Sequence, residues 1–366
     1  MKKLISLMLA LMLVFSLATV AMGTTQVTPD GQYTAQITKT YTTTAGAVPA
    51  TLPGETLTFT VTAADANPDK SKLITIGTNN SCTVSTASNT NTIDITLPTY
   101  DKVGVYNYTV SENAPTPVTQ GVTYTNTTFG VQVVVYYETV TKEEGDKEVS
   151  VQEMKVDMSF TSDGDNNQKI DSFTNNYDLG SLTVKKEIEG NLASADQYFD
   201  FVVNLTAAGK VMTDITISGG SHPSNSTSIS ATNTVDGVTT TGWTGTKTIN
   251  LKLKGDETVT FSNVPEGVTY TVNEAASHAA ADANGSDTSK GYTVTCTGGD
   301  SIDETKKTIS GTINADTTDA TVIKNTKSTN ITTGVITESA PYVLLIAICA
   351  VAAVAFVIKR RNSVEF

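Results

Sequence analysis

"SLTVKKEIEG" (residues 181–190) alternates like a β-strand, yet a lysine occupies one of its apolar positions. With a period of two, Leu182, Val184, Lys186 and Ile188 share one face, and Lys185 lies on the other. A lysine on a face that enters a protein core must be paired or must react, because burial of a lone charge is costly. The partners of Lys186 therefore decide what this part of the chain does.

The stretch "YTAQITKTY" (33–41) repeats this arrangement near the start of the chain. Its alternation places Lys39 on the same face as Ala35, Ile37 and Tyr41. The chain thus holds two strands in which a lysine takes a core position.

Two further motifs follow each of these strands in the same order. Tyr-x-Val-x-Glu ends at Glu112 and again at Glu274, and an apolar residue stands two before Asn175 and two before Asn325. The separations from lysine to asparagine are 175 − 39 = 136 and 325 − 186 = 139 residues. Singly, such residues are commonly surface lysines, strand-end charges and turn formers. The same residues recur in both halves of the chain, in the same order and at the same positions in the alternating pattern. This recurrence indicates an internal repeat of the size of a domain.

Short alternating runs, bounded by Gly, Asn, Asp and Pro, fill both halves of the chain. Their period and spacing predict antiparallel sandwiches. The fold class is therefore all-β, with two tandem immunoglobulin-like sandwiches in residues 24–178 and 179–327. "KEEGDK" (142–147) is interpreted as a charged hairpin tip. The predicted runs are 55–63, 103–112, 128–138, 148–160, 197–205, 247–264 and 267–274.

The two ends of the chain have the composition of processing segments. Residues 1–23 have a basic start, an apolar stretch and small residues, which predicts a secretory signal peptide cleaved after Ala21 or Gly23. Residues 342–358 are apolar and precede the basic cluster 359–361, which predicts a membrane helix with a cytoplasmic tail. The sequence between the two ends is then extracellular.

Composition excludes several classes of function. A net charge of −13 and a pI near 4.6 argue against a nucleic-acid partner. Two histidines and three dispersed cysteines leave little from which to build a catalytic dyad, a metal site or a disulfide scaffold. We expect no cofactor and no metal.

The recurring residues permit one reaction when they are buried together. Burial favours the neutral amine of lysine, which can attack the side-chain carbonyl of asparagine. A protonated glutamate can hydrogen-bond that carbonyl and pass protons to the leaving ammonia. The product is an amide from lysine Nζ to asparagine Cγ, formed once, so we expect no enzyme beyond this single autocatalytic turnover. The reactants would be Lys39, Glu112 and Asn175 in the first half, and Lys186, Glu274 and Asn325 in the second.

At these residues the chain resembles the sortase-assembled major (backbone) pilins of Gram-positive bacteria, in particular the streptococcal T-antigen/FctA-like group with Cna B-type isopeptide domains. "LTVKKEIEGN" is similar to the opening strand of that family, "FTNNY" to its closing strand, and Tyr270-x-Val272-x-Glu274 to its catalytic-acid strand. The resemblance implies a structural subunit of a fimbrial shaft on the cell wall, supporting adhesion. The implied partners are a sortase, neighbouring copies of the chain, minor pilins, and a peptidoglycan or membrane anchor.

The tail and one loop supply candidate residues for polymerisation. "NITTG" (330–334) aligns with the sortase pentapeptide of this group, although its proline is missing, and the bond cut would be Thr333–Gly334. The acceptor would be an exposed lysine shortly before the closing strand, for which we select Lys169. Lys142, Lys147 and Lys155 are alternatives.

Two other functions fit parts of the sequence. A monomeric wall- or membrane-anchored adhesin could use the same domains as a stalk. A surface enzyme is disfavoured by the scarcity of histidine and by the lack of a nucleophile elbow or a phosphate-binding loop.

Overall fold

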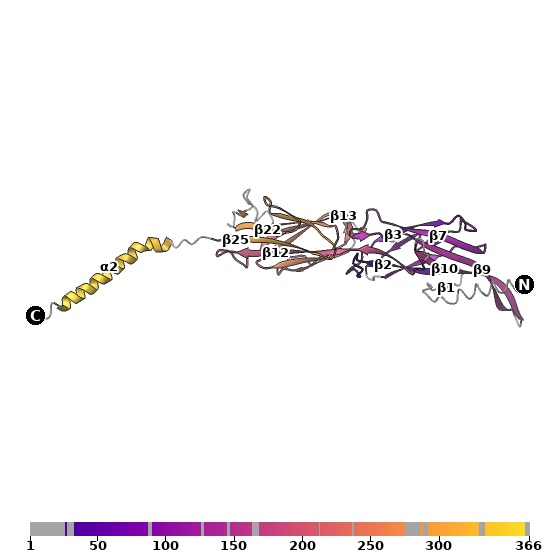
Figure 1. Ribbon diagram of the computed structural model, residues 1–366, viewed down its shortest axis with the longest axis horizontal. Helices are drawn as coiled ribbons and strands as arrows, with labels where there is room; N and C mark the ends of the chain where they lie inside the picture. Colours follow the sequence, from indigo (N-terminus) through magenta and orange to yellow (C-terminus); the bar gives the residue numbers. More distant parts are fainter. Residues whose placement is uncertain are drawn as a thin grey trace.

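The predicted all-β architecture is confirmed, with two β-sandwiches placed end to end (Figure 1). A computed structural model describes the chain, and the strands account for nearly all of its regular structure. The described residues are 26–27, 33–86, 90–125, 128–144, 147–162, 168–211, 213–235, 238–274, 286–287, 292–328 and 334–362.

The first sandwich consists of two sheets. One has the order β4-β6-β2-β11-β8, with β1 added on β2, and the other has the order β10-β9-β7-β3-β5. The strands of the first sheet are β1 (Gln26–Val27), β2 (Tyr33–Thr42), β4 (Thr75–Ile76), β6 (Thr90–Thr96), β8 (Val122–Thr123) and β11 (Ser172–Tyr177). Those of the second are β3 (Thr56–Ala63), β5 (Ser81–Thr83), β7 (Gly104–Asn113), β9 (Thr128–Glu144) and β10 (Lys147–Ser162).

The second sandwich repeats the plan with the orders β15-β14-β19-β12-β25-β22-β21 and β18-β13-β20-β24-β23. The strands of its first sheet are β12 (Leu179–Glu189), β14 (Ile215–Gly219), β15 (Ser228–Ile229), β19 (Thr258–Pro265), β21 (Ser286–Asp287), β22 (Tyr292–Gly298) and β25 (Thr318–Thr326). Those of its second sheet are β13 (Phe199–Val211), β18 (Trp243–Leu253), β20 (Thr269–Glu274), β23 (Ser301–Asp303) and β24 (Thr308–Thr312). The pair β16 (Thr232–Val235) and β17 (Val238–Thr241) forms a small separate ribbon.

The pairing of the first strand with the last corrects the antiparallel prediction. Most neighbours in the sheets are antiparallel, but β2 pairs with β11 in parallel, and β12 pairs with β25 in parallel. Parallel neighbours need a long connection, and here nearly the whole domain supplies it. Local alternation carries no information on such a distant partner.

The predicted run 247–264 is divided between the two sheets of the second sandwich. β18 ends at Leu253 in one sheet, and β19 begins at Thr258 in the other. Asp256 in the connecting turn has a φ of 63°, a left-handed conformation that favours a short polar residue or glycine. The period of two is common to both strands and therefore could not locate this crossover.

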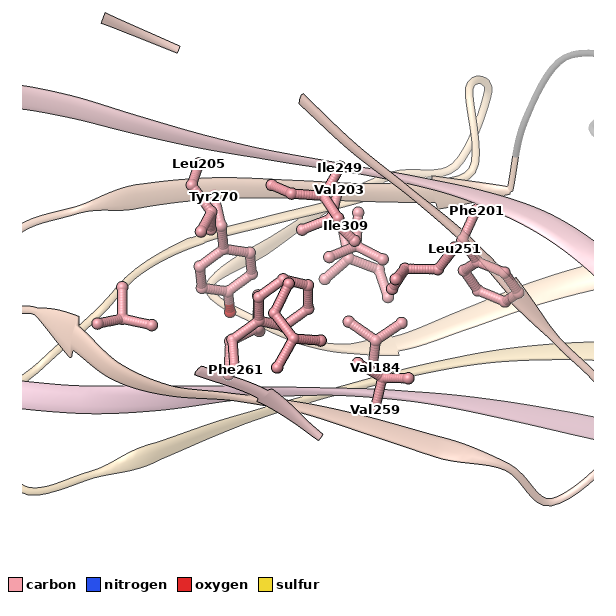
Figure 2. Close-up of a cluster of buried hydrophobic side chains, with 14 of the residues drawn as sticks. Val184, Phe201, Val203, Leu205, Ile249, Leu251, Val259, Phe261, Tyr270 and Ile309 are labelled. Atoms are coloured by element: carbon pink, nitrogen blue, oxygen red, sulfur yellow. The ribbon is translucent and has the colours of Figure 1, made fainter. Parts of the chain in front are cut away.

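Alternation along each strand builds the two cores. In β2 the predicted face of Ala35, Ile37 and Tyr41 is buried, and Leu182 and Val184 of β12 are buried in the second core. Figure 2 shows the second core, in which Val184 and Val259 from one sheet meet Phe201 and Leu251 from the other.

A hydrogen-bonded joint links the two sandwiches, with only Asp178 between β11 and β12. The Asp178 carboxyl is buried and accepts hydrogen bonds from the backbone N–H and the hydroxyl of Thr44, at 2.8 and 2.7 Å. Gln120, from the first sandwich, donates from Nε2 to the Glu266 carbonyl (2.6 Å) and accepts at Oε1 from the Gly209 N–H (3.0 Å). Gln120 therefore ties the first sandwich to strand β13 of the second and to its loop at Glu266.

After the second sandwich, the described part of the chain contains one helix, α2 (Gly334–Asn362). Among the described residues, no helix satisfies the length and apolar character needed to cross a membrane. Residues 1–23 and 330–333 lie outside the described residues, so the signal peptide and most of the pentapeptide remain predictions.

Candidate cross-linking sites

The structure brings Lys39, Glu112 and Asn175 together inside the first sandwich. Lys39 Nζ lies 2.8 Å from Glu112 Oε2, and Asn175 Nδ2 donates a hydrogen bond to Glu112 Oε1 at 2.6 Å. Lys39 and Asn175 are both 0% exposed, and Glu112 is 5% exposed. Three polar side chains that sequence analysis selected from three distant runs thus form one buried contact.

The second sandwich contains the same arrangement. Lys186 Nζ donates to Glu274 Oε2 at 2.9 Å, and Asn325 Nδ2 donates to Glu274 Oε1 at 3.0 Å. Lys186 and Asn325 are fully buried. Each glutamate therefore bridges a lysine and an asparagine, with one carboxyl oxygen on each.

Strand register explains why the lysine and the asparagine meet. In the parallel pair, Lys39 stands opposite Phe173, so Asn175 is two residues further along and points to the same face. Lys186 stands opposite Ile323 with the same offset to Asn325. The glutamates come from β7 and β20 in the facing sheets, so each carboxyl reaches its lysine–asparagine pair across the core.

Aromatic rings surround both amines and exclude water. Lys39 Nζ lies 4.4 Å from the centre of the Phe173 ring, and Lys186 Nζ lies 4.2 Å from that of Phe199. Burial lowers the pKa of Lys39 below its usual value and lowers the pKa of Lys186 to about 8, because the loss of hydration outweighs the attraction of the nearby glutamate. Both amines are therefore shifted toward the neutral, nucleophilic form.

The contacts of the carboxyl groups refine the expected proton path. Sequence reasoning expected each glutamate to hydrogen-bond the asparagine carbonyl, but in the structure it contacts the amide nitrogen, which is the leaving group. The carbonyl oxygens Asn175 Oδ1 and Asn325 Oδ1 are buried and accept no hydrogen bond from any described residue. One carboxyl group thus contacts both the nitrogen that would lose a proton and the nitrogen that would gain one in the expected reaction.

The position of Lys185 agrees with the predicted alternation, in which Lys185 and Lys186 lie on opposite faces of the strand. Its Nζ lies on the outer side of β12 and donates to Glu187 Oε1 at 2.8 Å. Adjacent lysines in one strand therefore have different environments, and only Lys186 enters the core.

A second buried carboxyl group, Glu55, was missed by sequence analysis. Three hydroxyls donate to it, from Tyr41 (2.5 Å), Thr119 (2.6 Å) and Tyr124 (2.5 Å). Thr119 also bridges to Lys210 of the second sandwich, so this cluster holds the loop that forms the joint. A glutamate at the start of an ordinary strand carries no local signal of such burial.

The candidate residues for polymerisation lie in different settings. Lys169 is exposed and pairs with Thr161 at the edge of β10. It lines a polar groove of about 570 Å³ together with Asn107, Gln132 and Ser159. Gly334 is the first residue of α2, and Thr333 lies outside the described residues.

The depressed pKa of Lys186 makes a pH-dependent rate of cross-linking testable. Only the neutral amine attacks, so the rate in the second sandwich should rise with pH and level off above about 8; well below that value it should fall about tenfold per pH unit. Chain purified unfolded in denaturant, before the three groups can meet, can be refolded at a series of pH values and sampled by intact mass. A rate that does not change with pH would exclude amine deprotonation as the controlling step.

Comparison with known proteins gives two domain matches that divide at the joint. Residues 35–178 match the FctA family, described as a Spy0128-like isopeptide containing domain, and residues 180–327 match a domain of unknown function, DUF7601. A pilin of Streptococcus pyogenes serotype M1 is 28% identical over 287 residues, covering 75% of this chain and 74% of that protein.

Two solved structures are among those similar to this chain. The major pilin from Streptococcus pyogenes is 22% identical, covering 81% of this chain and 99% of its own, with a TM-score of 0.47. The T3.2 major pilin of the same species is 22% identical, covering 80% and 97%, with a TM-score of 0.44.

Proposed function

We propose that this chain is a covalently polymerised pilus shaft subunit, because residues 35–178 match the family described as a Spy0128-like isopeptide containing domain and the chain is similar to a streptococcal pilin. Two internal cross-links stabilise each copy. A sortase joins successive copies and delivers the filament to the surface of a Gram-positive cell, where it supports adhesion.

The observation that carries this proposal is the repetition of one buried contact. Lysine, glutamate and asparagine meet in both sandwiches with the same bridging carboxyl. Attack of lysine Nζ on asparagine Cγ forms an amide and releases ammonia, and the carboxyl moves the proton between the two nitrogens. A structural polymer has use for such bonds, because they join the first strand of each sandwich to its last.

The links between copies are proposed to use the tail of one and a loop of the next. A sortase would cleave Thr333–Gly334 and transfer Thr333 to Lys169, which is exposed and lines the polar groove described above. Residues 342–361 would hold the precursor in the membrane until that cleavage. Minor pilins and a peptidoglycan or membrane anchor complete the proposed partners.

This function predicts a ladder of covalent multimers. Co-expression with the sortase of the source bacterium should yield bands that survive boiling in SDS, and Thr333→Ala should reduce them to one band, because no acyl-enzyme can form. Ser328→Ala, two residues before the pentapeptide, is the matched control and should leave the ladder. A single anchored band from the unaltered chain would contradict polymerisation and favour the monomeric adhesin or stalk.

A further inference from the structure

A two-stranded ribbon projects from the first sandwich at the end away from the joint (Figure 1). β9 and β10 pair along their whole length, but β7 pairs with β9 only as far as Val135. Val135 and Val156 are the last buried residues of the two strands. Beyond them nine more pairs, from Tyr136–Lys155 to Glu144–Lys147, extend the ribbon by about 30 Å at ~3.4 Å per residue.

The exposed side chains of the ribbon indicate that it meets a partner. Tyr137 lies on the same face as the buried residues Val133 and Val135, yet it is 58% exposed because no second sheet covers it. Tyr136 and Val149 are 37% and 36% exposed. An isolated two-stranded hairpin is only marginally stable in water, and exposed apolar groups on a projecting element are typical of a contact surface.

Chain length identifies the partner, given the proposed function. The last strand of the second sandwich ends at Thr326, so Thr333 is 333 − 326 = 7 residues further, a span of at most ~25 Å. Lys169 pairs with Thr161, and from there to Lys147 the ribbon strand runs 161 − 147 = 14 residues, or about 48 Å. The tip of the ribbon is therefore further from Lys169 than the end of the last strand of the preceding copy can be, because the tail between that strand and Thr333 is shorter than the ribbon.

The direction of the ribbon agrees with this estimate. The second sandwich of the same chain occupies the opposite end of the first sandwich, so the preceding copy approaches the end from which the ribbon projects (Figure 1). With Thr333 bonded to Lys169, the outer part of the ribbon must lie beside the second sandwich of that copy.

We propose that residues 136–144 and 147–155 form an intersubunit arm, which packs the face that carries Tyr137 against the second sandwich of the preceding copy of this chain. This inference rests on the proposed polymer and on Lys169 as its linking residue. The covalent link prevents separation of the copies, and the arm would limit bending between them.

The test compares purified polymer with monomer by hydrogen–deuterium exchange. In the polymer the ribbon amides should exchange about tenfold more slowly, because contact with the next copy suppresses opening of the ribbon. Tyr137→Ser should keep the SDS-resistant ladder, remove the added protection and lower the bending stiffness of filaments measured by electron microscopy. The matched control is Val48→Ser, an equally exposed apolar residue (61%) in the loop after β2, at the joint end of the same sandwich.

The possible failures of this test are distinguishable. A ladder whose ribbon amides exchange as fast as those of the monomer would overturn the arm alone, and so would Tyr137→Ser filaments as stiff as the control. Absence of any ladder from the unaltered chain would overturn the polymer and the arm with it.

Discussion

Glu274→Gln is expected to leave the second sandwich without its cross-link, so that the variant is lighter than its own sequence by one ammonia molecule instead of two. Glutamine keeps the size of the side chain but cannot carry the proton from Lys186 to the departing nitrogen of Asn325. The unaltered region between the two predicted processing segments should itself be lighter than its sequence by two ammonia molecules. Intact mass spectrometry measures both quantities.

Loss of the cross-link should also lower stability. Closing a loop of 325 − 186 = 139 residues contributes about 4–5 kcal/mol on the loop-entropy model. For a domain of this size that corresponds to a fall in Tm of roughly 10–20 °C, measurable by calorimetry. Glu304→Gln, at an exposed position of the same sandwich, should change neither mass loss nor Tm. If Glu274→Gln still lost both ammonia molecules, the role of the carboxyl would have to be reassigned.

Lys169→Arg is expected to collapse the multimer ladder to monomer. Arginine preserves the charge and length of the side chain, but its guanidinium stays protonated and cannot attack the acyl-enzyme at Thr333. The two internal cross-links should be unaffected, since Lys169 is remote from both buried contacts, and intact mass verifies this. SDS gels after co-expression with the sortase measure the result.

The competing lysines provide the controls for this substitution. Lys142 and Lys155 lie on the ribbon and both pair with Glu153, at 2.6 and 2.9 Å. Lys142→Arg and Lys155→Arg should retain the ladder. A ladder that persists in Lys169→Arg and disappears in one of these variants would move the linkage to the ribbon and remove the basis for the intersubunit arm.

Much of the fold and the candidate sites could be predicted because they depend on alternation. A period of two placed Lys39 with Ile37 and Lys186 with Val184, and the structure buries all four. The repetition of one order in both halves then selected the glutamates and asparagines from many similar residues. Those predictions needed only the local pattern and its duplication.

Other features depend on contacts that a local pattern cannot contain. The parallel pairing of β2 with β11 joins strands more than 100 residues apart, and the burial of Glu55 requires hydroxyls from β2 and from the connection between β7 and β9. The length of the ribbon was underestimated because β9 is exposed on both faces beyond Val135, so the apolar alternation that marks a strand is lost there. The choice of Lys169 over the other candidate lysines depends on the exposure of its side chain and on the residues around it. The sequence alone could not rank the candidates by these properties.

The parallel relation between first and last strands also sets how far each subunit reaches. A chain that enters and leaves a module along parallel neighbours travels from one pole of that module to the other, whereas antiparallel neighbours would return it to its starting pole. Since β11 passes into β12 through a single residue, both modules add their full height to one axis. In the proposed fibre, every copy added would increase the distance from the cell, and none of that distance would depend on a flexible spacer between the modules.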